Sequence, residues 1–310
     1  MIRVSREAAK RHTADMTGKN IVITGATAGI GQETAKSLAK MGGNIIIAAR
    51  NRDKAQRTIE TIRKDLDSDT VQLEHRSLDL TDLDSVREFA SSFSAGDSLD
   101  VLINNAGVGH DTGVTRQGIE RTFGINHLGH FLLIKLLLPP LVRSSGRIVH
   151  VSSMGHMGAK HKYFDMPFKG PCTQLRPQQR YERSKAAQIL FSKALQRRFD
   201  QNQIPCTSVS LHPGGVRTKI LENQTWDSAL VLFLLRPILV DPPEGARTTV
   251  YLATRDRPDE IAGKYFHYGL FRKGIYEKPG TAVVNDEALQ ERLWKISEEL
   301  VGEEFHVGSR

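Results

Sequence analysis

The chain has 310 residues, of which 39% are hydrophobic and 25% charged, and its formal net charge is +8. This composition is ordinary for a soluble globular protein, and two cysteines argue against a disulfide framework and fit a reducing compartment. The basic residues are scattered without a run of five or more, so we expect no nucleic-acid partner.

The sequence carries no clear membrane or export signal. Residues 1–19 are polar and charged, unlike a secretory signal. The longest apolar stretches, Phe131–Leu138 and Ala229–Leu235, are shorter than the ~20 residues of a membrane span. We therefore expect a cytoplasmic protein, with peripheral contact to a membrane left open. The basic stretch Arg3–Arg11 could touch anionic lipid, but a loose solvated tail is the favoured interpretation.

Short apolar runs alternate with amphipathic segments along the chain. The expected strands are Ile21–Thr24, Asn44–Ala49, Val71–Ser77, Val101–Ile103, Arg147–Ser152 and Thr207–Leu211, and the expected helices are Gly31–Met41, Arg52–Leu66, Leu83–Phe93, Gln117–Leu138 and Tyr181–Phe199. This alternation predicts a single α/β domain over residues 1–310, a Rossmann-type doubly wound parallel sheet with helices on both faces. Residues 1–17 are interpreted as an N-terminal extension, and 155–180 and 214–243 as insertions on the substrate side.

The segment TGATAGIG follows the first expected strand and contains three glycines. Gly25 allows a sharp turn, and Gly29 and Gly31 permit a phosphate to approach the backbone. The start of a helix after such a turn offers backbone N–H groups to an anion. The spacing is not the usual G-x-G-x-x-G, so a tight turn without a ligand is the alternative.

The second expected strand ends at Ala49 and is followed by Arg50. Dinucleotide-binding folds that use NAD tend to carry an acidic residue here, which binds the ribose 2′-hydroxyl. A guanidinium suits the 2′-phosphate of NADP instead. The pattern therefore favours NADP over NAD, with a solvated arginine as the alternative.

A candidate catalytic group follows the fifth expected strand. Tyr181 and Lys185 are four residues apart and share a face of the expected helix. An ammonium beside a phenol favours the phenolate, and a phenol tuned in this way can exchange a proton with a carbonyl or alcohol. Ser153 ends the preceding strand, at the same edge of the sheet as the glycine turn.

These segments together resemble the short-chain dehydrogenase/reductase family. The matching pieces, in the family's order, are TGATAGIG (24–31), LDLTD (78–82), NNAG (104–107), INHLGHF (125–131), VSS (151–153), YERSK (181–185) and HPGGVRT (212–218). The segment NHLGHF, the 27 residues between Ser153 and Tyr181, and the segment GKYFHYG are similar to the retinol-dehydrogenase-like and WW-domain-oxidoreductase-like branch. In that branch the implied substrates are lipophilic alcohols, aldehydes and ketones.

The resemblance implies roles for individual residues. Tyr181 would be the general acid/base, Lys185 would bind the nicotinamide ribose and lower the pKa of Tyr181, Ser153 would orient the carbonyl, and Asn126 would hold a water for proton relay. The implied cofactor-binding residues are Gly25, Thr27, Gly29, Ile30, Gly31, Arg50, Asp79, Leu80, Asn105, Ala106, Gly107, Tyr181, Lys185, Pro213, Gly214, Val216 and Thr218. One departure concerns the glycine loop, where some NADP-using members carry a basic residue and this chain has Thr27 and Ala28.

We therefore predict an NADP-dependent oxidoreductase acting on a lipophilic alcohol, aldehyde or ketone, either retinol-dehydrogenase-like or a carbonyl reductase. A non-catalytic NADP(H)-binding sensor or scaffold is the alternative. No metal site is expected, because His156 and His161 have no Cys or carboxylate partner nearby in the sequence. A homo-oligomer formed through the helices at 117–138 and 181–199 is left open. For the apolar segment 229–240 two interpretations have equal weight: a lid or membrane-touching element, or a helix packed on the core or at a subunit contact.

Overall fold

The structure is a computed structural model that describes all residues except 1, 12, 110, 217–239, 270–273 and 309–310. Within the described residues, nine strands form one sheet in the order β1-β9-β8-β7-β6-β5-β2-β3-β4. The strands are β1 (Arg3–Ser5), β2 (Asn20–Thr24), β3 (Asn44–Ala49), β4 (Leu73–Ser77), β5 (Val101–Asn104), β6 (Arg147–Val151), β7 (Thr207–His212), β8 (Tyr265–Tyr268) and β9 (Gly274–Lys278).

The strands from β4 to β8 are parallel, β9 pairs antiparallel with β8, and the edge strand β1 pairs antiparallel with β9. The strand order changes direction between β2 and β5, because β3 and β4 lie on one side of β2 and the later strands on the other. Ligands of doubly wound folds bind at such a switch point, beyond the carboxyl ends of the strands. The predicted fold class is confirmed.

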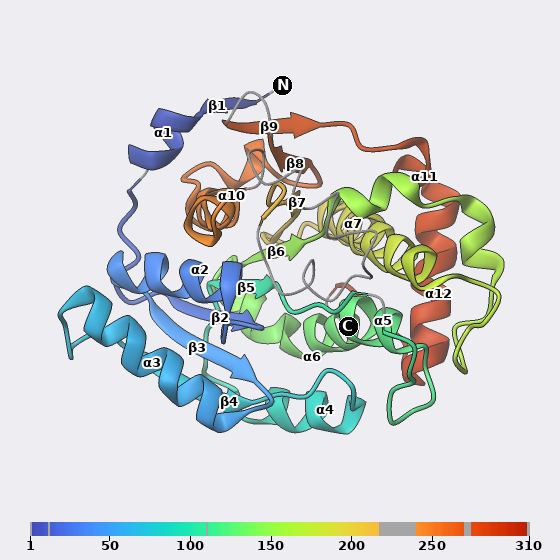
Figure 1. Cartoon of the computed structure of the whole chain (residues 1–310), viewed down its shortest axis with the longest axis horizontal. Coiled ribbons are helices and arrows are strands. Elements are labelled where there is room, and N and C mark those ends of the chain that lie inside the picture. Colours follow the sequence, from blue (N-terminus) through green and yellow to red (C-terminus); the bar gives the residue numbers. More distant parts are fainter. Residues whose placement is uncertain (1, 12, 110, 217–239, 270–273, 309–310) are drawn as a thin grey trace, which may run out of the picture.

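Helices cover both faces of the sheet. They are α1 (Arg6–Arg11), α2 (Gly29–Lys40), α3 (Arg52–Leu66), α4 (Leu83–Ser91), α5 (Arg121–Phe123), α6 (Gly129–Arg143), α7 (Pro177–Gln201), α10 (Pro242–Thr254), α11 (Ala282–Asn285) and α12 (Glu287–Val301). Short 3₁₀ turns are η2 (Met154–Gly158), η3 (His161–Asp165) and η4 (Pro258–Glu260). One apolar cluster contains residues of α2, α3 and α10, and a second contains residues of α4, α6, α7 and α12. Figure 1 shows α2 and α10 on one side of the central strands and α6 and α7 on the other.

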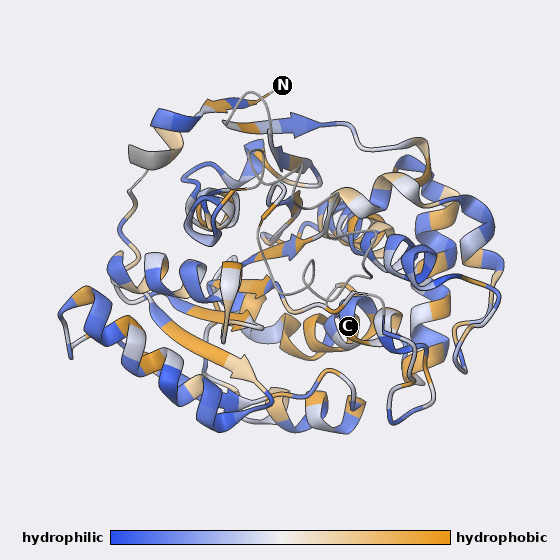
Figure 2. Cartoon of the chain, in the orientation of Figure 1, coloured by the Kyte–Doolittle hydropathy of each residue, from blue (hydrophilic) through white to orange (hydrophobic). Residues whose placement is uncertain are grey.

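The expected helix over 117–138 is one helical path from Arg121 to Arg143 that contains a π-helical stretch, η1 (Gly124–Leu128). By length and composition it could cross a membrane, but 78% of its most apolar window is buried inside the protein. Figure 2 shows this apolar helix packed beside the apolar central strands. Its residues therefore form core in this structure. Single π-helical turns often occur at functional sites, and this one contains Asn126.

The N-terminal stretch differs from its prediction. Residues 3–5 form β1, which pairs with β9, and α1 follows directly. Arg6 forms an ion pair with Glu244 of α10, with Nε 2.8 Å from Oε1. The interpretation of residues 3–11 as a loose tail is therefore wrong, because the edge of β9 offers unpaired backbone groups to a neighbouring strand.

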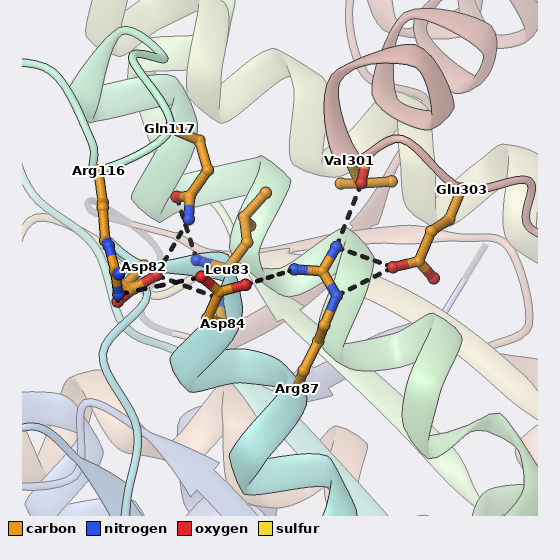
Figure 3. A network of polar contacts seen from close by, with 8 residues as sticks. All are labelled: Asp82, Leu83, Asp84, Arg87, Arg116, Gln117, Val301 and Glu303. Carbon is orange, nitrogen blue, oxygen red and sulfur yellow. Dashed lines mark hydrogen bonds and ion pairs between the residues drawn. The ribbon is translucent and has the colours of Figure 1, made fainter.

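A polar network ties the C-terminal segment and the loop before α5 to α4 (Figure 3). Arg87 of α4 donates to Glu303 from Nε at 3.0 Å and from Nη2 at 2.8 Å. Asp82, the N-cap of α4, accepts from Arg116 at 2.6 Å and from the amide of Gln117 at 3.0 Å. These contacts hold the loop that follows β4 in place, next to the carboxyl edge of the sheet.

Candidate functional site

The glycine turn after β2 adopts a backbone that requires glycine. Gly25 has φ +67° and Gly29 has φ +56°, both in the left-handed region. A Cβ on Gly31 would lie 2.5 Å from the side-chain amide of Asn105 and 2.5 Å from the carbonyl oxygen of Gly25. Ala28 precedes α2 and gives it no side-chain cap. The turn is therefore a tight cradle that ends on the amino terminus of an uncapped helix.

Asn105, after β5, braces this turn from the neighbouring strand. Its amide donates to the carbonyl oxygens of Thr24 at 2.9 Å and of Gly25 at 3.2 Å. The hydroxyl of Thr24 accepts from the backbone N–H groups of Asn105 and Ala106, each at 3.0 Å. Ala106 lies against Gly25, where a Cβ would come within 2.8 Å of its Cα. The structure thus brings Asn105 and Ala106 to the glycine turn, as predicted, while their contact with a cofactor stays a prediction.

Ser153 and Tyr181 meet at the carboxyl edge of the sheet. Ser153 follows β6, Tyr181 stands in the second turn of α7, and their side chains are hydrogen-bonded. Gly155 allows η2 to pack on the phenol, because a Cβ there would be 2.9 Å from Cε1 of Tyr181. Burial raises the pKa of Tyr181, and the hydrogen bond with Ser153 opposes that rise. The predicted pair of hydroxyls therefore exists in the fold.

Lys185 lies one turn beyond Tyr181 and is almost fully buried. Its Nζ donates to the carbonyl oxygen of Val151 at 3.1 Å and to Gln188 at 3.0 Å, and lies 5.9 Å from the centroid of the Tyr181 ring. Burial lowers the pKa of Lys185 to about 7. The hydrogen bonds of the ammonium go to Val151 and Gln188 and burial raises the pKa of Tyr181, so the lowering of that pKa by Lys185 stays a prediction. Gly107 leaves room for the ammonium, since a Cβ there would be 3.3 Å from Nζ.

Asn126, in the π-helical stretch, joins three elements. Its Oδ1 accepts from the N–H of Val108 at 2.8 Å, and its Nδ2 donates to the carbonyl of Val108 and the hydroxyl of Ser184, each at 2.9 Å. Its backbone carbonyl lies 3.1 Å from Nδ1 of His130. Asn126 therefore fixes the loop after β5 against α7, next to Lys185, and its role in holding a water stays a prediction.

The segment after β7 also reaches this edge. Gly214 has φ +96° and packs against Tyr268, and Pro213 precedes it. Val216 is buried, and a Cβ on Gly245 of α10 would lie 2.5 Å from Val216 and 3.4 Å from Ile30. Val216 and Ile30 therefore meet at α10, beside the glycine turn.

Two predicted features fall outside the part of the chain that the structure describes. Thr218 is one, and residues 229–239 of the apolar segment are the other.

Arg50 and Asp79 come together at the carboxyl ends of β3 and β4. The guanidinium of Arg50 is 3.8 Å from the carboxylate of Asp79, and its side chain is 67% exposed. Leu80 is buried and packs against Gly129, where a Cβ would be 3.0 Å from Cδ2 of Leu80. Thr27 is half-buried in the glycine turn. Arg50, Asp79 and Leu80, three of the predicted cofactor-binding residues, thus lie just after β3 and β4, on the side of β2 opposite β5.

A buried ion pair that sequence reasoning missed supports the whole site. Arg183 of α7 and Glu120 are both fully buried, with Nη2 3.5 Å from Oε2. Glu120 also accepts from the N–H groups of Thr122 at 2.8 Å and Phe123 at 3.0 Å, at the start of the helix that carries Asn126. The sequence does show a charged residue, Glu120, directly before an apolar helix. The same pattern is ordinary for a helix start exposed to solvent, so it does not reveal a buried pair.

The same guanidinium also holds part of the segment 155–180, which is predicted to lie on the substrate side. Arg183 donates to the carbonyl oxygens of Tyr163 and Met166 at 3.3 Å and of Pro167 at 3.2 Å. The ring of Phe168 lies 4.3 Å from its Cζ. Arg183 therefore connects α7 with the helix that carries Asn126 and with residues 163–168.

Comparison with known proteins adds independent findings. A family model described as short chain dehydrogenase matches residues 19–164. The chain is 36% identical to retinol dehydrogenase 13 of Homo sapiens over 299 residues, which are 93% of this chain and 86% of that protein. It is also 36% identical to WW domain-containing oxidoreductase of Gallus gallus, over 94% of this chain and 70% of that protein.

Solved structures show the same architecture. The crystal structure of an uncharacterized protein from Mycobacterium paratuberculosis has a TM-score of 0.77 and 33% identity, covering 96% of this chain and 98% of that chain. A short-chain type dehydrogenase/reductase from Mycobacterium marinum has a TM-score of 0.63 and 23% identity, covering 82% of this chain and 94% of that chain, and shares the fold.

Proposed function

The chain belongs to the short-chain dehydrogenase/reductase family and is an oxidoreductase related to retinol dehydrogenases, and from this premise we propose that it uses NADP(H) to interconvert a lipophilic alcohol and its aldehyde or ketone. One observation carries the proposal: the hydroxyls of Ser153 and Tyr181 are hydrogen-bonded to each other at the carboxyl edge of the sheet. Lys185 and the glycine turn lie at the same edge.

The residues at this edge fit the nicotinamide dinucleotides that the family uses. The cradle formed by Gly25 and Gly31 would be filled by a Cβ at either position, and α2 presents an uncapped amino terminus there. The turn and the start of α2 would hold the pyrophosphate, and Ile30 and Val216 would line its path toward Tyr181. This assignment of the cofactor-binding residues is part of the proposal.

Replacing Gly31 with alanine tests the cradle. The new Cβ would come within 2.5 Å of both Asn105 and Gly25, and overpacking of this kind costs about 1–3 kcal/mol. We expect a lower free energy of unfolding and weaker NADPH binding, measured by urea denaturation and fluorescence titration. Gly96→Ala is the control, because a Cβ on Gly96 meets nothing within 4 Å. Equal NADPH affinity in the two variants would contradict the proposal that this cradle binds the cofactor.

The preference for NADP rests on Arg50. Its exposed guanidinium follows β3, where a ribose 2′-phosphate would lie. A hydrogen bond to a charged group is worth about 1.5–3 kcal/mol, so Arg50→Ala should lower kcat/KM with NADPH by about 10- to 100-fold. Activity with NADH should change little. The control is Arg57→Ala, an exposed arginine farther along α3, and an equal loss with both dinucleotides would refute the assignment.

In the proposed reaction, side chains at the carboxyl edge of the sheet supply and accept the proton. When bound, the nicotinamide ring supplies or accepts the hydride. During reduction the carbonyl oxygen gains negative charge, and the hydroxyls of Ser153 and Tyr181 can both donate to it. Tyr181 then gives its proton to that oxygen, and in oxidation it takes the proton back. Ser153 keeps the oxygen in place throughout.

The apolar character of the substrate has support beside Ser153. Met154 and Met157 of η2 are 38% and 59% exposed, and with Val114 they are the exposed large hydrophobic side chains among the described residues. An apolar substrate would cover such a surface next to the reacting hydroxyls. The names of the retinol dehydrogenases among the relatives agree with this substrate class. A cytoplasmic location, contact with a membrane surface and a homo-oligomer stay predictions.

A screen of NADPH and NADH oxidation over retinoid, steroid and aliphatic aldehydes and ketones tests the proposal. We expect turnover of at least one lipophilic carbonyl compound, faster with NADPH than with NADH. Binding of NADPH without turnover of any compound in the screen would favour the alternative, a non-catalytic NADP(H) sensor or scaffold.

A further inference from the structure

The ammonium of Lys185 has two hydrogen-bond acceptors, and one is a side chain with no role assigned so far. Nζ donates to the backbone carbonyl of Val151 at 3.1 Å and to Oε1 of Gln188 at 3.0 Å. A residue of any type would supply the first acceptor, whereas the second depends on glutamine. Lys185 is 4% exposed and Gln188 is 1% exposed, so bulk water does not reach the contact.

The orientation of the Gln188 side-chain amide shows that its contact with Lys185 fixes it. Its oxygen faces the ammonium, and its Nε2 is buried without a hydrogen-bond partner among the described residues. The reversed amide would place N–H donors against the three donors of the ammonium. An unpaired buried donor is costly, so the contact with Lys185 determines the orientation.

Within the described residues, no negatively charged group faces Lys185 that could replace the Gln188 carbonyl as the acceptor. The titratable groups that face it in the described part of the chain are Tyr181 of the same helix, His130 of α6 and His212 of β7. Burial lowers the pKa of His130 to about 4 and that of His212 to about 3, so both rings are neutral near pH 7. Carbonyl oxygens are therefore the groups that stabilise the ammonium.

We infer that Gln188 is a positioning residue whose side-chain carbonyl keeps the ammonium of Lys185 charged and in place beside Tyr181 and Gly107. Gln188 does not touch the reacting atoms and acts through Lys185. Its effect on turnover rests on the proposed function, whereas the contact itself is a feature of the fold.

Titration of Lys185 in the dinucleotide-free protein tests the inference directly. The midpoint is measured by carbon-13 NMR of labelled lysine side chains, with the Lys185 signal assigned by its loss in Lys185→Arg. Burial lowers the pKa of Lys185 to about 7, and an acceptor favours the charged form. Gln188→Met should therefore lower the midpoint by about 1 pH unit, and the isosteric Gln188→Glu should raise it by about as much.

The control is Gln196→Met, which removes another buried glutamine of α7. Gln196 accepts from the N–H of Ser208 at 2.7 Å and donates to Asp200 at 2.8 Å, away from Lys185. This variant should lose stability and keep the Lys185 midpoint of the wild type. If Gln188→Met does not fold, Gln188→Glu, which keeps the size of the side chain, still tests the inference. A raised Lys185 midpoint in that variant supports the inference, and an unchanged midpoint refutes it.

The pH dependence of NADPH-driven reduction gives the second measurement. The alkaline loss of activity should move to lower pH in Gln188→Met and to higher pH in Gln188→Glu. Shifted NMR midpoints in a protein that turns over no carbonyl would support the positioning and reject the proposed function. Unchanged midpoints in both variants of Gln188 would overturn the inference, whether or not the protein is active.

Discussion

Tyr181→Phe should lower turnover by about 10²- to 10⁴-fold, the range over which a positioned acid or base accelerates a reaction. The variant keeps the ring against Gly155 and removes only the hydroxyl that is hydrogen-bonded to Ser153. Without it, Ser153 is the remaining hydroxyl of the proposed pair that donates to the oxygen of the substrate. We therefore expect kcat to fall while the affinity for NADPH stays near that of the wild type.

Stopped-flow reduction and fluorescence titration separate these two quantities. The matched control is Tyr276→Phe, because Tyr276 lies on β9 near the far edge of the sheet and outside the proposed site. That variant should turn over like the wild type. Turnover by Tyr181→Phe at the wild-type rate would remove Tyr181 from the mechanism.

Arg183→Met should be strongly destabilising, lowering the free energy of unfolding by about 3–5 kcal/mol. The substitution leaves the fully buried carboxylate of Glu120 without its cation. It also removes the donor to the carbonyl oxygens of Tyr163, Met166 and Pro167. Breaking a buried pair from one side is costly because the remaining charge has no counter-charge.

Urea denaturation of Arg183→Met, Glu120→Gln and the double variant forms a cycle that isolates the pair. The double variant should recover part of the loss, since it leaves no buried charge. A solvent-exposed pair, Arg257 with Asp259, is the comparison, and Arg257→Ala should cost no more than about 1 kcal/mol. A cost for Arg183→Met as small as that of Arg257→Ala would show that the ion pair does not support the fold.

The central part of the fold could be predicted because its signals are local. The strands β2, β3 and β5 are continuous buried runs, and the glycine turn and the Tyr181–Lys185 spacing are read within a few residues. The strands β1, β9 and β8, at one side of the sheet, were missed, since they are short and contain polar residues. Their strand character comes from the neighbour that they pair with, which a single sequence does not show.

The sequence predicted which residues form the site better than it predicted their pKa shifts and contacts. Ser153, Tyr181 and Lys185 are brought together as expected, but the direction of the pKa shift of Tyr181 depends on burial, which spacing does not reveal. Gln188 was missed because a glutamine in a helix has no distinct pattern. The pairing of Glu120 with Arg183 joins residues 63 positions apart, so only the folded chain shows it.

The contacts of Arg183 also limit how the segment 155–180, which is predicted to lie on the substrate side, can be engineered. The acceptors of Arg183 in residues 163–167 are backbone carbonyls, so its hydrogen bonds depend on the path of the backbone there and not on the identity of the side chains. A loop transplanted from a relative with one residue more or less would move those carbonyls away from the guanidinium. Variants of constant loop length thus keep these hydrogen bonds, whereas loop grafts need Glu120 and Arg183 redesigned with them.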